Sequence, residues 1–111
     1  MQIHTSGPLP GVAHLSLDGR LTLVSAPQLR TAIIEAVDSG RSRVVVDLTE
    51  VGFMDSSGLG ALVAGLKKTR QEGGDLRLTG VNQQVATVLE LTNLDRVLQV
   101  HATVEEATHG W

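Results

Sequence analysis

The chain has 111 residues, enough for one hydrophobic core, and we predict a single domain over residues 1–111. Its net charge of −3 and its aromatic content of 2% argue against a nucleic-acid binder, which needs a basic patch or stacking side chains. Cysteine is absent, and no apolar run approaches the roughly 20 residues of a membrane span. We therefore expect a cytoplasmic protein that does not insert into membranes.

The first strands are predicted at the N-terminus. Residues 7–11, Gly-Pro-Leu-Pro-Gly, form a turn signal between two short strands. Apolar residues then alternate at Ala13, Leu15 and Leu17, as in a strand with one buried face. We expect the Asp18-Gly19 step to end that strand.

A helix is predicted from Ser25 to Gly40, with apolar residues at helical spacing. Ser25 is the expected N-cap, and Gln28 three residues later would complete a capping box. Val24 and Leu29 stand at the positions of a hydrophobic staple.

The continuous β-branched run Val44-Val45-Val46 predicts a central strand covered on both faces. It leads through Phe53-Met54 to a second helix ending at about Gln71. Later elements are a strand with Leu76 and Leu78, a helix capped by Asn82, a strand over residues 97–100 and a brief helix with a capping box of Thr103 and Glu106. This order predicts an α/β fold: a mixed sheet of about five strands with about four helices.

One face of the second helix carries small residues, opposite the apolar stripe that we expect to enter the core. A solvent-facing helix surface normally carries Glu, Lys or Gln. The sequence leaves two interpretations open: another protein docks closely on this face, or the face packs inside the same domain. Its members are Gly58, Ala61, Ala64 and Gly65, with Lys68 beside them.

Two serines, Ser56 and Ser57, stand at the start of the same helix. One interpretation is N-capping, in which a hydroxyl accepts from a free backbone N–H. The other is phosphorylation, since the positive partial charge and free N–H groups of a helix start tolerate a phosphate.

The segment Phe53-Met54-Asp55-Ser56-Ser57-Gly58-Leu59-Gly60, after the strand over residues 44–48, closely resembles the central motif of STAS domains. Within that family it resembles the bacterial anti-sigma factor antagonists. The resemblance implies a protein, not an enzyme, that binds a serine-kinase anti-sigma factor with a histidine-kinase-type ATPase fold and frees a sigma factor. It also implies that phosphorylation releases the antagonist and that a PP2C-type phosphatase restores it.

Aligned on Asp-Ser-Ser-Gly, the resemblance makes Ser56 the phosphoacceptor. Ser57 becomes a cap or hydroxyl neighbour, and Asp55 shapes the loop and contacts the partner. The family often has an acidic residue, Leu and Asp after the glycine at position 19; this chain has Arg20-Leu21-Thr22 instead. If that turn touches the partner, Arg20 and Thr22 change its charge. The alternative function is a constitutive STAS subunit of a stress-sensing scaffold or of a lipid-transport ATPase.

Enzymatic chemistry has little support in the sequence. The stretch from Gly60 to Thr69 lacks the lysine that a phosphate-binding loop needs after its second glycine, because Leu66 stands there. The four histidines have no metal-ligand spacing. Ser56 has no recognisable general base. We expect no cofactor, no metal and a monomer.

Overall fold

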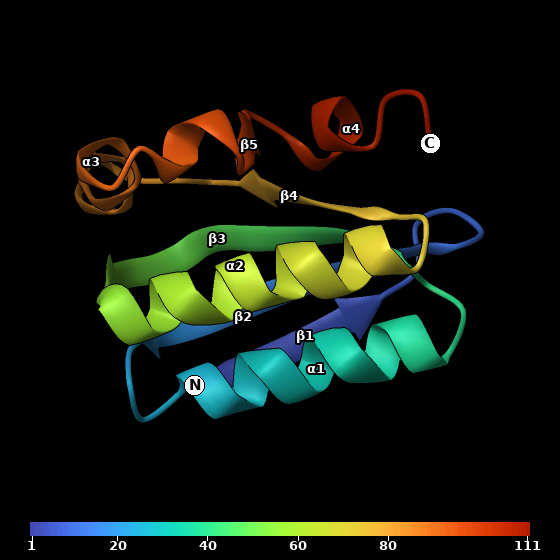
Figure 1. Cartoon of the computed structure of the whole chain (residues 1–111), viewed down its shortest axis with the longest axis horizontal. Coiled ribbons are helices and arrows are strands. Elements are labelled where there is room, and N and C mark those ends of the chain that lie inside the picture. The colour runs from blue at the N-terminus through green and yellow to red at the C-terminus, as the bar shows by residue number, and fades with distance from the viewer.

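The computed structural model describes residues 1–111. Five strands and four α-helices follow one another in the order that the sequence predicts (Figure 1). The strands are β1 (Gln2–Ser6), β2 (Val12–Leu21), β3 (Arg43–Met54), β4 (Asp75–Thr79) and β5 (Gln99–His101). The helices are α1 (Ala26–Asp38), α2 (Ser56–Gln71), α3 (Gln83–Leu91) and α4 (Val104–Ala107), with a 3-10 helix at Leu94–Arg96.

All strands belong to one mixed sheet in chain order, with β1 antiparallel to β2 and the other neighbours parallel. Two parallel neighbouring strands must be joined by a crossover connection, and such crossovers are right-handed. When successive crossovers advance in the same direction along the sheet, their helices lie on the same face of the sheet. Figure 1 shows α1 and α2 side by side across the same face of the sheet. The predicted α/β class and mixed sheet are confirmed.

The core lies between this face and the two helices, and it contains Val44 and Val46 of β3. Val45 points to the other face and is also fully buried. It pairs in register with Arg77, whose guanidinium donates to the Ala107 carbonyl of α4 at 2.7 Å. The C-terminal helix therefore covers this second face, which confirms the prediction of a strand buried on both sides.

The predicted start of α1 is wrong in its details. The Ser25 hydroxyl makes no cap hydrogen bond; it accepts from the Thr22 N–H at 2.9 Å and donates to the Arg20 carbonyl at 2.6 Å. Gln28 donates to the Met1 carbonyl instead of completing a capping box. Val24 is 89% exposed, so it forms no staple. Ser25 stabilises the turn before the helix and not the helix end.

The Asp18-Gly19 step does not end β2. The pairing with β3 shifts register between Ser16 and Asp18 and again between Gly19 and Leu21, and the strand continues to Leu21. Gly19 has φ of +127°, a value that side-chain-bearing residues rarely adopt. The glycine thus allows a β-bulge, which carries the chain on to the turn beside the start of α2.

Candidate functional site

Asp55 is the residue that caps α2. Its Oδ1 accepts from the Gly58 N–H at 3.0 Å, which satisfies one of the donors that a helix start leaves free. Because Asp55 fills this role, neither serine after it is the cap. The interpretation of Ser56 or Ser57 as the N-cap is therefore wrong.

The same carboxylate ties the start of α2 to the turn after β2. Its Oδ2 accepts from the Leu23 N–H at 3.1 Å, and the Asp55 N–H donates to the Leu21 carbonyl at 3.2 Å. Gly58 also lies against this turn, because a methyl group added there would come within 2.5 Å of the Leu21 oxygen. The backbone that presents Ser56 is thus fixed on both sides.

Asp55 carries a negative charge at neutral pH. The Gly58 N–H holds the pKa of its carboxyl below the ordinary value of 3.8, and the Leu23 N–H lowers this pKa further. The carboxylate compensates the positive partial charge of the helix start. Asp55 thus connects the start of α2 with the turn after β2.

Ser56 occupies the first position of α2 and is exposed. Its hydroxyl makes no hydrogen bond within the chain, and neither does that of the half-buried Ser57. A free hydroxyl on a fixed backbone is accessible to an enzyme without local unfolding. Ser56 is the more accessible of the two.

Most of the small-residue face of α2 is internal. Gly58 and Ala61 are buried, and a methyl group at Gly65 would lie 2.5 Å from Ile33 Cδ1 of α1 and 3.0 Å from Leu76 Cδ1 of β4. These three residues are small because the domain packs closely against them. The prediction that they dock a partner is wrong.

Two other predicted contact residues, Ala64 and Lys68, remain half-buried on α2. At 1.5 Å per residue they lie about 12 and 18 Å further along the helix axis than Ser56. They do not share the small surface around Ser56. They line a pocket between α1 and α2 instead.

Arg20 and Thr22, by contrast, lie beside the start of α2. Thr22 is half-buried in the turn that Ser25 and Asp55 hold, and Arg20 is exposed. The Arg20 guanidinium lies over the Phe53 ring, 4.8 Å from its centroid. This geometry is a cation–π contact at the end of β3, two residues before Asp55.

Three exposed apolar side chains belong to residues next to this site along the chain: Leu23 (72% exposed) and Val24 (89%) follow Thr22, and Phe53 (37%) comes two positions before Asp55. We call them the apolar rim. Clustered exposed apolar groups are typical of protein-binding surfaces. Their exposure could not be predicted from the sequence, because Val24 stands at a staple position and Phe53 continues the apolar stretch after a buried strand. The available signal was their position next to the Asp55-Ser56 motif.

A family model for the STAS domain matches residues 8–107. The chain belongs to the STAS domain family. An anti-sigma-B factor antagonist of Bacillus subtilis (strain 168) is 28% identical to this STAS domain over 91 residues, which are 82% of this chain and 83% of that protein. The predicted resemblance to anti-sigma factor antagonists is thus confirmed by relatives of that name.

Solved structures agree with this assignment. The crystal structure of an anti-sigma factor antagonist from Mycobacterium paratuberculosis has a TM-score of 0.82 and 29% identity, covering 97% of this chain and 92% of that one. The Bacillus cell fate determinant SpoIIAA in its phosphorylated form has a TM-score of 0.75, covers 97% of both chains and, at 22% identity, shares the fold. None of the helices of this STAS domain combines the length and apolar character that a membrane crossing requires.

Proposed function

We propose that this STAS domain is an anti-sigma factor antagonist that is switched by phosphorylation of Ser56. Unmodified, it binds a serine-kinase anti-sigma factor with a histidine-kinase-type ATPase fold and so frees a sigma factor. A PP2C-type phosphatase restores it after phosphorylation. The observation that carries the proposal is the exposed, unbonded Ser56 hydroxyl on a backbone fixed by Asp55. The protein acts by binding and is not an enzyme.

The chemistry is a transfer between the partner's ATP and Ser56. The Ser56 Oγ attacks the γ-phosphorus of ATP, the bond from that phosphorus to the β–γ bridging oxygen breaks, and ADP leaves. The hydroxyl proton passes to a base of the kinase, since no base of this chain bonds to Ser56. Removal of the phosphate is a separate hydrolysis: the phosphatase directs water onto the phosphorus, the bond from phosphorus to Ser56 Oγ breaks, inorganic phosphate is released and the serine oxygen takes up a proton.

The apolar rim and Arg20 supply the docking surface for the kinase. Leu23 lies on the turn that Asp55 holds, so it is positioned together with Ser56. Burial of exposed apolar side chains contributes about 25 cal/mol per Å² of area removed from water. Arg20 would meet an acidic or aromatic group of the partner. In this respect the chain differs from family members that have an acidic residue at this turn.

Phosphate at Ser56 explains release without a change of fold. It adds about −1.5 to −2 charges at neutral pH. Placed in the centre of an interface, such a charge costs about 2–5 kcal/mol, which is roughly a thirty- to several-thousand-fold loss of affinity. The helix start tolerates the phosphate in the free protein, because its N–H groups and dipole favour negative charge.

The test is affinity capture from native cell lysate with wild-type, Ser56→Ala and Ser56→Asp proteins. We expect wild-type and Ser56→Ala to retain an ATP-binding serine kinase, and Ser56→Asp to retain less of it. Equal capture of a scaffold or transporter subunit by all three would overturn the proposal and favour a constitutive STAS subunit.

The proposed monomeric state is checked by light scattering, and the proposed cytoplasmic location is checked by cell fractionation.

A matched pair of variants tests the docking surface. Leu23→Ser removes an exposed apolar side chain beside Ser56 and should weaken kinase binding about tenfold. Leu91→Ser removes another exposed leucine, on α3 and outside the rim, and should leave binding unchanged. Equal affinities for the two variants would exclude the rim from the interface.

A further inference from the structure

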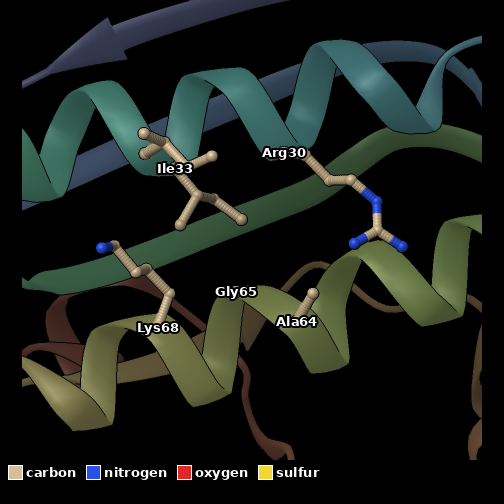
Figure 2. A pocket seen from close by; sticks show the side chains of 6 residues that line it. Arg30, Ile33, Ala64, Gly65 and Lys68 are labelled. Atoms are coloured by element: carbon tan, nitrogen blue, oxygen red, sulfur yellow. The ribbon is translucent and has the colours of Figure 1, made fainter.

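The structure contains a pocket of about 240 Å³ between α1 and α2, away from the apolar rim. Figure 2 shows Arg30 and Ile33 extending from α1 toward α2, and Lys68 extending from α2 toward α1. The floor is apolar, formed by Ile33, Ala64 and Gly65, with Ile34 at its side. Two cationic side chains thus flank an apolar surface, and no carboxylate lines it.

The apolar floor of the pocket depends on Gly65, which has no side chain. A methyl group at this position would come within 2.5 Å of Ile33 Cδ1, so the glycine lets Ile33 lie against the backbone of α2. Ile33 is 1% exposed, but Ile34 beside it is 47% exposed. A ligand in the pocket would cover apolar surface that water now contacts.

The two cations are available to a ligand. Arg30 is exposed and takes part in no ion pair of the chain. Lys68 has one partner, Glu72, at 3.8 Å, and the two side chains are 38% and 52% exposed. Such exposed pairs contribute little, so an anion competes easily for Lys68. The chain as a whole has a charge of −3, which makes this local positive site distinctive.

We propose that the pocket binds an organic anion with an aliphatic body, of the class of medium-chain carboxylates. The carboxylate would accept from Arg30 or Lys68, and the chain would lie over Ile34 and Ala64, above the buried Ile33. At about 30 Å³ for each water-sized volume, the pocket of about 240 Å³ has room for roughly eight non-hydrogen atoms. A ligand of this size binds with a Kd in about the micromolar to millimolar range. This site is independent of phosphorylation at Ser56.

The test is a titration of the ¹⁵N-labelled full chain with octanoate, followed by NMR. We expect saturable shifts at the amides of Ile33, Ile34, Ala64 and Gly65. Octan-1-ol, which lacks the charge, and inorganic phosphate, which lacks the chain, should each bind at least tenfold more weakly. Equal binding of either probe would overturn the ligand class, and absence of saturable shifts with octanoate would overturn the site.

Variants locate the binding. Arg30→Gln together with Lys68→Gln should weaken octanoate binding tenfold or more, the order expected from loss of charge-assisted hydrogen bonds. Lys67→Gln removes one positive charge at an exposed neighbour outside the pocket; it is the control and should bind as wild type. Ala64→Leu should fill the pocket and abolish binding with both cations retained. Unfolding midpoints verify that each variant is folded. Wild-type affinity in both the double variant and Ala64→Leu would contradict the proposal.

Discussion

The starts of α1 and α2 each carry a serine, and the two serines have different surroundings. Ser25 precedes α1, is 4% exposed and bonds through its hydroxyl to Thr22 and Arg20. Ser56 begins α2, is exposed and has an unused hydroxyl, because Asp55 already caps the helix. The Ser25 hydroxyl is used by the fold. The Ser56 hydroxyl is left free because the preceding residue, Asp55, makes the hydrogen bond that caps the helix.

The largest effect on stability is expected at Gly58, which fixes the start of α2 against the turn. Gly58→Ala should lower the free energy of unfolding by about 2–3 kcal/mol, because the new methyl group meets a backbone oxygen of Leu21 that has no freedom to move. Gly60→Ala is the control. Its methyl group meets only Arg30 Nη2, at 3.6 Å. Because alanine favours a helix more than glycine does, the free energy of unfolding should rise by about 0.5–1 kcal/mol. Urea unfolding measures both, and equal stabilities would disprove the close approach at position 58.

Ser25→Ala should lower the free energy of unfolding by about 1–2 kcal/mol, since the Thr22 N–H and the Arg20 carbonyl lose their partner. The turn would loosen, and Leu23 and Val24 with it. Urea unfolding checks the stability, and amide hydrogen exchange of residues 22–25 checks the turn. Wild-type exchange and stability in this variant would mean that the Ser25 hydroxyl contributes nothing.

Acid should destabilise the protein through Asp55 and Asp47. Both have folded-state pKa values below 3.8, so their stabilisation is full above that pH and is lost as pH falls through the folded pKa. For Asp47, burial raises the pKa, but hydrogen bonds from Thr49 and His14 outweigh it.

Asp55→Asn keeps a cap acceptor without a titrating charge. We expect its melting temperature to fall less steeply than that of wild type between about pH 4 and pH 2, with Asp47 still contributing. Identical slopes in wild type and variant would contradict a lowered pKa at Asp55.

The smallest effect is expected at Ser56. Ser56→Ala should change the free energy of unfolding by less than about 0.5 kcal/mol, as for an exposed side chain without contacts. The informative quantity is the difference between the free energies of unfolding of Ser56→Ala and Ser25→Ala, both measured by urea unfolding. A loss as large as that of Ser25→Ala would show that the Ser56 hydroxyl has a structural partner.

Much of the fold could be predicted from local patterns. The Asn82 cap is confirmed, with its side chain accepting from the Val85 N–H at 2.9 Å, and so is Gly40 after α1, with φ of +88°. Thr103 caps α4 as predicted, but Glu106 accepts from Ala102 and not from Thr103. Such signals involve a few consecutive residues, and this is why the sequence reveals them.

The site was harder to predict, because it depends on residues distant in sequence. Whether Gly58 or Gly65 faces a partner or the same domain depends on where Leu21 and Ile33 lie. Asp55 caps α2 through the nearby Gly58 N–H, a local contact, but its second bond, from the Leu23 N–H 32 positions away, depends on the fold. The motif itself identified Ser56 through a family resemblance, but only the structure shows that its hydroxyl is free.

The most direct test of the account is a phosphotransfer assay that compares the two adjacent serines of α2. Wild-type, Ser56→Ala and Ser57→Ala proteins are incubated with ATP and the kinase captured from the lysate, and the phosphorylated residue is mapped by mass spectrometry. The account predicts one phosphate on Ser56 in wild type and in Ser57→Ala, and none in Ser56→Ala. Phosphate on Ser57, or continued phosphorylation of Ser56→Ala at the wild-type rate, would contradict it.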